Sequence, residues 1–284
     1  MQSLNAWNYG AAALHLGATI YAYNKLSSDK NRTVQMIRLK YDDEQTQTSR
    51  IDIPVTIENE SKIDLKFIIV GFFAITSFAH FCYATDFFGR GWYSKSVLGV
   101  GWNPFRWVEY SLSAGLMIYL ISIVSGTKDQ VSAVAAALIT PGLMINGFTT
   151  EKEIHQNDLH KWSLNPRQVK KPDIDHLIVL SNFIPGWFLY GVHWYIILSN
   201  YAKIAKEAKE AGKPIDASVT FMVYSQLAFF SLFGVIQTYQ VYRWFTSRAG
   251  REEPAFIGYE KVYIALSAIT KLVLAATVIY AMRN

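Results

Sequence analysis

The stretch Ser267-Ala268-Ile269-Thr270-Lys271-Leu272-Val273-Leu274-Ala275 places a lysine near the centre of the last apolar segment of the chain, residues 256–281. A charged ammonium at the middle of a bilayer costs at least about 2.5 kcal/mol, so an intramembrane lysine indicates a functional site. A Schiff base to a carbonyl compound is the usual reason to place a desolvated lysine in an apolar pocket. Its protonated form needs a buried counterion, and the sequence offers Glu109.

Six more long segments with few charges precede this one. Apolar residues make up 51% of the 284 residues, and their arrangement in long runs argues against a soluble protein of the same composition. Each run is long enough to cross about 30 Å of hydrocarbon at about 1.5 Å per residue. The sequence therefore predicts an all-α membrane protein, a single seven-transmembrane-helix bundle over residues 1–284, with spans at about 7–24, 64–88, 104–125, 130–149, 176–202, 216–245 and 255–281.

The charge pattern and the single cysteine exclude several classes of protein. The net charge is +5, but the basic residues are dispersed among the loops, which suits contact with membrane lipid headgroups better than nucleic acid. The counts of basic residues on the two sides are similar, so they do not decide the orientation. Cys82 cannot form an internal disulfide, and we expect it to be a small core residue.

Residues 25–62 form a polar section that is far longer than an ordinary connection between helices. Residues 32–41 and 49–58 alternate in polarity and are rich in β-branched side chains, and an acidic, polar run separates them. This pattern predicts a two-stranded β-hairpin in the first interhelical loop. Because a lone hairpin is marginal in water, we expect it to pack on the helix ends or on another subunit.

The other loops give no sign of enzymatic chemistry. The glycines of residues 88–104 match no dinucleotide or phosphate-loop spacing, and turns explain them. In the polar loop predicted at residues 151–175, His155 and His160 are five apart, which fits no helical zinc pair, so we expect no metal site. Clustered His-x-x-x-His motifs of a membrane di-iron oxidase are also absent from the sequence, and we predict that the protein is not an enzyme.

The third span carries the charges that could serve Lys271. Arg106, Glu109 and Ser113 are separated by three and four residues, so they share one face of a helix. Arg106 could also be an ordinary anchor that reaches the interface. Further polar groups lie inside other spans, namely Ser267 one turn before the lysine, and His15 and His80 in the first and second spans. Either histidine alone could be an ordinary core residue.

Taken together, these features resemble the microbial-type retinal proteins. The third span carries an Arg-aromatic-x-carboxylate-aromatic-x-x-Ser run beginning at Arg106. Compared with the light-driven proton pumps of that superfamily, the counterion position holds Glu109, the carboxylate four residues before the lysine is replaced by Ser267, and the internal proton donor by Leu120. With R-W-V-E-Y-S-L-S-A on span three, S-x-x-x-K on span seven, two intramembrane histidines and a strand-forming first loop, the whole chain is similar to the heliorhodopsins.

The resemblance implies a cofactor, a set of site residues and an assembly. All-trans retinal would be bound to Lys271 as a protonated Schiff base with Glu109 as its single counterion. The other positions that match the family's site are Ser267, Ser113, His15, His80, Phe230, Gln237, Tyr110 and Arg106. Phe230 and Gln237 resemble a pair at the ring side of the pocket, although a core aromatic and a helix–helix hydrogen bond would look the same. The family also implies a cytoplasmic N-terminus, a homodimer and an extracellular hairpin loop at residues 25–62.

We therefore predict a light-sensing protein of the cell membrane with multiple transmembrane passes. Because the sequence lacks the carboxylates with which the pumps release and reload a proton, we expect a slow photocycle without net ion pumping. Such a protein would signal through an unknown cytoplasmic partner. The alternative is a light-gated proton channel or a weak light-driven proton transporter, because a channel needs only a wet path.

Overall fold

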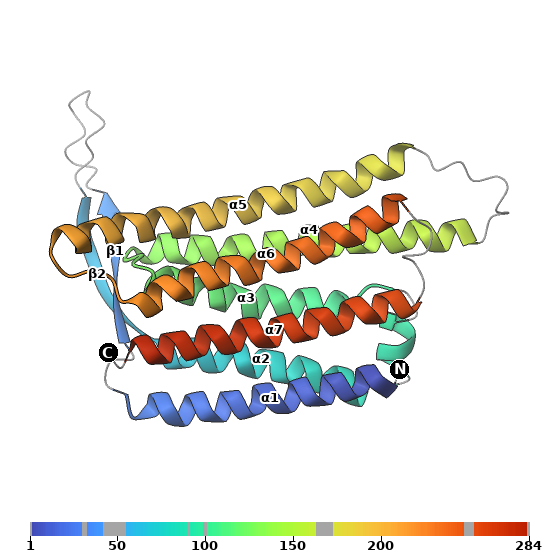
Figure 1. Cartoon of the computed structure of the whole chain (residues 1–284), viewed down its shortest axis with the longest axis horizontal. Coiled ribbons are helices and arrows are strands. Elements are labelled where there is room, and N and C mark those ends of the chain that lie inside the picture. Colours follow the sequence, from blue (N-terminus) through green and yellow to red (C-terminus); the bar gives the residue numbers. More distant parts are fainter. Residues whose placement is uncertain are drawn as a thin grey trace.

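The computed structural model describes residues 2–29, 33–41, 55–89, 91–98, 101–162, 173–246 and 253–282. Within these ranges the chain forms seven α-helices that lie side by side in one bundle (Figure 1). The predicted seven-helix, mostly helical fold is confirmed. The helices are α1 (Gln2–Ser27), α2 (Leu65–Thr85), α3 (Pro104–Val124), α4 (Gln130–Trp162), α5 (Asp173–Glu210), α6 (Ala217–Thr246) and α7 (Glu253–Ala281).

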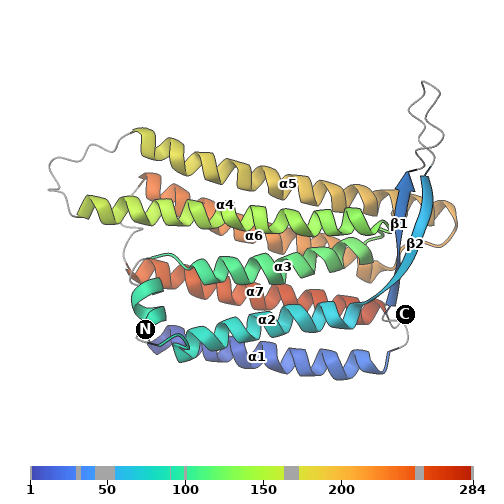
Figure 2. The ribbon, with the colours of Figure 1, turned by 180° about the vertical axis from the view of Figure 1, so that it is seen from behind.

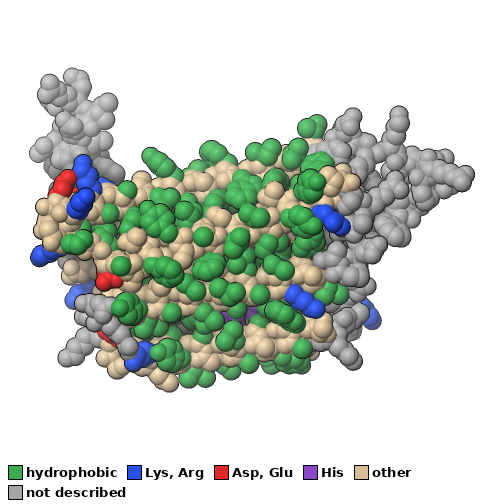
Figure 3. All heavy atoms as spheres, in the orientation of Figure 1, with side chains coloured by type: hydrophobic (Ala, Val, Ile, Leu, Met, Phe, Trp, Pro, Cys, Tyr) green, Lys and Arg blue, Asp and Glu red, His purple; other side chains and the backbone are tan. Residues whose placement is uncertain are grey.

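The surface of the bundle suits a membrane. Figure 3 shows hydrophobic side chains along the length of the helices, with most of the visible charged side chains near the two ends. Among the described residues, α2, α3, α4 up to Ile154, α6 and α7 from Phe256 are long and apolar enough to cross a bilayer. Polar and aromatic residues interrupt the apolar runs of α1 and α5, which lowers their hydropathy. The molecule is thus a multi-pass membrane protein.

The predicted hairpin is present, but its second strand lies further along the chain than expected. Strands β1 (Thr33–Tyr41) and β2 (Val55–Asp64) pair in antiparallel fashion, with an irregularity between Arg38 and Leu39. The predicted strand at 49–58 agrees with β2 at 55–58 but ends too early, because β2 continues through 59–64; residues 49–54 lie outside the described residues. β2 runs directly into α2, where Asp64 caps the helix by accepting a hydrogen bond from the backbone of Lys66.

The hairpin packs on the helix ends of its own chain. The backbone nitrogen of Ile37 donates to the carbonyl of Lys128, in the connection between α3 and α4, at 2.9 Å. Figure 2 shows the two strands crossing one end of the bundle, near the C-terminus, while the N-terminus lies at the opposite end. The two ends of the molecule therefore differ in structure.

The glycine-rich segment before α3 contains more than the turns that we expected. A short π-helix, η2 (Trp92–Leu98), lies within it at the N-terminal end of the molecule. Gly89 and Gly91 flank its start with φ of 72° each, so glycine is required there for backbone reasons. Asn103 then caps α3, and Pro104 occupies its first turn, where proline is favoured.

Two helices are longer than the spans predicted from hydropathy. α4 was expected to end at 149 but continues to Trp162, so Glu151 belongs to a helix and not to a loop. α5, predicted to end at 202, extends to Glu210, and Asp216 caps α6 by accepting a hydrogen bond from the backbone of Ser218. Two hydrogen bonds from Ser218 lower the pKa of Asp216. The side chains of His155 and His160 lie outside the described residues.

Candidate functional site

Lys271 and Glu109 meet in the centre of the bundle. Both are buried, with 3% and 6% of their surfaces exposed. The Nζ atom of Lys271 lies 3.4 Å from Oε1 of Glu109 and donates a hydrogen bond to Ser267 Oγ at 2.7 Å. The ring of Tyr110 lies below the amine, with 5.3 Å from Nζ to the ring centroid. The predicted lysine, carboxylate, serine and tyrosine are thus in one cluster, and the two buried charges compensate each other.

A second helix stabilises the Glu109 carboxylate. Thr76 of α2 donates a hydrogen bond to Oε1 of Glu109. Ser113, one turn further along α3, lies near enough to stabilise the negative charge, although its hydroxyl makes no hydrogen bond of normal geometry to a described residue. The sequence analysis missed Thr76. It precedes His80 by four residues, so the spacing on α2 could have identified it as a residue on the same face.

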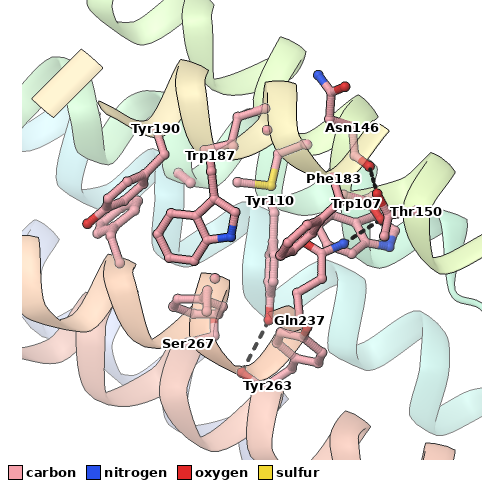
Figure 4. A pocket seen from close by; sticks show the side chains of 18 of the residues that line it. Trp107, Tyr110, Asn146, Thr150, Phe183, Trp187, Tyr190, Gln237, Tyr263 and Ser267 are labelled. Atoms are coloured by element: carbon pink, nitrogen blue, oxygen red, sulfur yellow. Dashed lines mark hydrogen bonds between the residues drawn. The ribbon is translucent and has the colours of Figure 1, made fainter. Parts of the chain in front are cut away.

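Next to Lys271 lies a cavity between α3, α4, α5, α6 and α7. The space between its walls, including the part open to solvent, is about 830 Å³. Figure 4 shows side chains from facing helices around it. The walls are mostly aromatic and aliphatic, with few polar groups: Trp107, Tyr110, Ala114, Met117, Leu143, Met144, Asn146, Gly147, Thr150, Asn182, Phe183, Gly186, Trp187, Tyr190, Phe230, Phe233, Gly234, Gln237, Tyr263, Ser267, Thr270 and Lys271.

Phe230 and Gln237, the pair singled out from the sequence, both line this cavity on α6. Gln237 also donates a hydrogen bond to the backbone oxygen of Gly147 on α4, at 2.8 Å. Gln237 therefore both links two helices and lines the cavity. Phe230 packs against Trp194 of α5, with 6.0 Å between the ring centroids.

Two glycines make room for the indole rings that border the cavity. A Cβ atom on Gly147 would lie 2.3 Å from the ring of Trp107, and one on Gly234 would lie 2.7 Å from the ring of Trp187. Real Cβ atoms do not approach other atoms so closely, so each indole occupies space that only glycine leaves free. The sequence analysis identified neither pair, because glycine in an apolar helix carries no sign of its partner.

His15 and His80 lie together between α1 and α2. Their rings are stacked, with centroids 5.8 Å apart, and both side chains are buried. Nδ1 of His15 lies 2.7 Å from the backbone oxygen of Ala11, and Nδ1 of His80 lies 2.8 Å from Oδ1 of Asn8. His80 lies one turn of α2 beyond Thr76, whose hydroxyl donates a hydrogen bond to Glu109. The sequence-predicted polar cluster therefore adjoins the ion pair.

Arg106 is directed away from the cavity. Its guanidinium forms ion pairs with Glu151 of α4, at 2.5 Å, and with Glu260 of α7. Trp107 Nε1 donates to Glu151 at 2.7 Å, and Asn103 Nδ2 donates to Glu260 at 3.1 Å. Arg106 neither lines the cavity nor touches the ion pair, and His15 and His80 lie outside the cavity as well. The sequence analysis missed Glu151 because it assigned this residue to a loop.

The comparisons with known proteins agree with this geometry. The model of the heliorhodopsin family matches residues 4–282. No curated protein matches the sequence. Among solved structures, the crystal structure of Exiguobacterium sibiricum rhodopsin is similar, with a TM-score of 0.60, 10% sequence identity and coverage of 99% of this chain and 96% of that chain. At this identity the similarity establishes the fold, and the resemblance found in the sequence is confirmed.

Proposed function

Because the chain belongs to the heliorhodopsin family, it is a retinal-binding, light-sensing membrane protein, and we propose that it senses light without pumping ions and has no enzymatic activity. In this proposal all-trans retinal is attached to Lys271 as a protonated Schiff base, and Glu109 is its single counterion. The observation that supports the proposal most directly is the buried ion pair of Lys271 and Glu109 beside a largely apolar cavity.

The residues around the cavity fit such a chromophore. Lys271 Nζ is the reactive amine, and the walls that follow it carry aromatic rings on both sides, suited to a flat, apolar polyene. Trp107 and Trp187 would hold the chain of the chromophore, and Phe230 and Gln237 its ring. When bound, retinal supplies the absorption of visible light and the photoisomerisation that follows.

The chain's own residues then decide where the proton at Lys271 Nζ goes. In the dark, Glu109 and Ser267 keep the proton on Nζ, because both offer an oxygen to it. Movement of Nζ away from Glu109 removes the charge that favours the protonated form. We propose that the proton passes to the polar cluster of His15, His80 and water, since neutral imidazole is a proton acceptor near neutral pH.

The arrangement of carboxylates supports a slow cycle without net transport. In the described part of the core, the buried carboxylates are Glu109, Glu151 and Glu260. Arg106 binds the last two, so neither is free to take up the proton. Towards the hairpin end, the described core offers no buried carboxylate. Within the described core, a proton that leaves Nζ therefore meets no chain of free carboxylates to either surface.

The alternative is a light-gated proton channel or a weak light-driven transporter. The specific observation in its favour is the Arg106 cluster, because Glu151 of α4 and Glu260 of α7 are buried carboxylates towards the N-terminal end of the bundle. If light separated Arg106 from one of them, that carboxylate could carry a proton onward.

Light-induced pH change and photocurrent distinguish the two functions. Cells expressing the protein are supplied with all-trans retinal, and flash photolysis is recorded on the same preparation. The sensor proposal predicts a coloured protein with a slow photocycle and no current. Sustained current above that of cells expressing the Lys271→Ala variant would contradict it and favour a transporter.

We further propose the placement of the molecule and its partners. The N-terminus, η2 and the C-terminal end of α4 lie at one end of the bundle, opposite the hairpin (Figures 1 and 2). This end would face the cytoplasm, and the polar regions 151–175 and 246–254 would bind a signalling partner. The hairpin end would then be extracellular. We propose that the protein lies in the cell membrane and forms a homodimer there.

A further inference from the structure

The two buried histidines differ in what fixes their protonation pattern. Nδ1 of His15 lies 2.7 Å from the backbone oxygen of Ala11, one turn earlier on α1. A carbonyl oxygen can only accept, so the hydrogen is on Nδ1, and Nε2 carries a lone pair. That Nε2 atom is buried and has no hydrogen-bond partner among the described residues. The backbone of α1 alone thus makes His15 Nε2 a proton acceptor.

His80 depends on a side chain for the same pattern. Oδ1 of Asn8 lies 2.8 Å from Nδ1 of His80, and Nδ2 of Asn8 is directed to the hydroxyl of Tyr93 in η2, at 3.5 Å. Asn8 has no exposed surface, and Tyr93 is held in turn by its backbone nitrogen, which donates to Asp86. Since an amide oxygen only accepts, this arrangement puts the hydrogen on Nδ1 of His80 and leaves Nε2 as an acceptor.

We propose that Asn8 is a positioning residue for the light-driven proton transfer, because it holds His80 with Nε2 unprotonated and so completes a pair of acceptor nitrogens with His15 Nε2. This inference rests on the proposed function, since it concerns the proton that leaves Lys271. It goes beyond that function by assigning the accepting atoms and by including a residue that touches neither the cavity nor the ion pair.

The consequence for a variant follows from the tautomers of imidazole. If the acceptor at position 8 is removed, the hydrogen of His80 is free to occupy Nε2 and then blocks that atom. Asn8→Leu has similar volume and removes the acceptor. Asn8→Asp keeps an oxygen that accepts from Nδ1, so it should preserve the tautomer.

The test is ¹⁵N nuclear magnetic resonance of histidine-labelled, retinal-loaded protein in the dark, with His80→Phe used to assign the His80 signals. We expect a protonated Nδ1 and an unprotonated Nε2 for His80 in the wild type and in Asn8→Asp, and a shift of hydrogen to Nε2 in Asn8→Leu. Flash photolysis should show deprotonation at Lys271 slowed roughly tenfold in Asn8→Leu, the size typical of losing a partner that orients a functional histidine, and restored in Asn8→Asp.

Ser77→Ala is the matched control, because Ser77 donates to the backbone of Ala12 at 2.9 Å across the same α1–α2 interface without touching either histidine. It should leave the His80 signals and the rate unchanged. A wild-type His80 protonated on Nε2, an Asn8→Leu variant with wild-type signals and rate, or a Ser77→Ala variant with the same defect would overturn the proposal. The nitrogen signals are read in the dark, so they test Asn8 even if flash photolysis refutes the proposed function.

Discussion

At the scale of single residues, the site depends on how one lysine and one carboxylate share charge inside a membrane. A lone buried charge costs several kcal/mol, and Lys271 and Glu109 avoid much of this cost by their 3.4 Å ion pair. Thr76 donates to the carboxylate, and Ser267 accepts from the amine. Each charge therefore has one ionic and one neutral partner.

The first prediction concerns the counterion. Glu109→Gln removes the negative charge next to Lys271 Nζ, so the absorption of the retinal-loaded protein should shift to the red, or the Schiff base should lose its proton at neutral pH. Absorption spectroscopy measures either result. Glu260→Gln changes a buried carboxylate that does not contact Lys271 and should have little effect on the spectrum. An unchanged spectrum in Glu109→Gln would mean that another group is the counterion.

The second prediction concerns Thr76. Thr76→Val keeps the shape of the side chain but leaves the Glu109 carboxylate without one donor, which should cost about 1–3 kcal/mol of stability. Thermal loss of the folded state, followed by circular dichroism, measures this. Thr140→Val is the control, because the Thr140 hydroxyl is buried without a partner among the described residues, so its removal should cost little. Equal destabilisation by both variants would argue against a role for the Thr76 hydroxyl.

The sequence revealed both charges and Ser267, the hydroxyl partner of the amine, but not Thr76, the hydroxyl partner of the carboxylate. Lys271 and Glu109 were found because charges are rare and expensive within apolar spans. Thr76 was missed because hydroxyl side chains are common in membrane helices and usually bond to their own backbone, as Thr270 does with Leu266. Only the packing of α2 against α3 identifies Thr76 as a partner of Glu109.

At the scale of helices, the cavity depends on where two helices carry glycine. Gly147 of α4 faces the indole of Trp107, and Gly234 of α6 faces that of Trp187. Both indoles line the cavity, so their positions set its width. The shape of the binding site is thus determined by residues that themselves have no side chain.

The third prediction tests one of these contacts. In Gly234→Ala the new methyl would lie 2.7 Å from the ring of Trp187, so the indole must move and the cavity must change shape. We expect weaker retinal uptake, a shifted absorption band, or both, measured by reconstitution with added retinal. Gly191→Ala on α5 has nothing within 4 Å of the new methyl and should behave like the wild type. Normal uptake and colour in Gly234→Ala would mean that Trp187 does not limit the site.

The helices were predicted more reliably than their ends. Long runs with few charges located all seven, but the charges of residues 151–153 led to a predicted end of α4 at 149. The helix continues because Glu151 has partners in Arg106 and Trp107. The second strand of the hairpin was placed too early, because its polarity pattern alone does not show that β2 runs into α2 at Asp64.

At the scale of the whole molecule, one buried cluster joins three helices. Arg106 of α3 pairs with Glu151 of α4 and Glu260 of α7, while the cavity and the histidines lie further inside the bundle. Because Arg106 shares a face of α3 with Glu109, the sequence predicted that Arg106 and Glu109 would belong to one site. The structure gives the arginine two other carboxylates, which sequence spacing could not reveal because they come from distant parts of the chain.

The fourth prediction concerns this cluster. Arg106→Gln leaves two buried carboxylates without their cation and should destabilise the protein by about 3–5 kcal/mol, with a smaller effect on colour than Glu109→Gln. Thermal unfolding and absorption spectroscopy measure the two effects. Adding Glu260→Gln to this variant removes one of the uncompensated charges and should restore part of the stability. A stable single variant, or a double variant less stable than the single one, would contradict the pairing.

The most direct test of the account as a whole is the visible absorption of the Lys271→Ala variant after addition of all-trans retinal. Lys66→Ala is the control, because Lys66 is also a buried lysine but lies at the start of α2, over the rings of Tyr23 and Phe67. We predict that Lys66→Ala and the wild type are coloured and that Lys271→Ala, folded and present in equal amount, has no visible band. A retinal band that persists in Lys271→Ala would contradict the assignment of Lys271 as the residue that binds the chromophore.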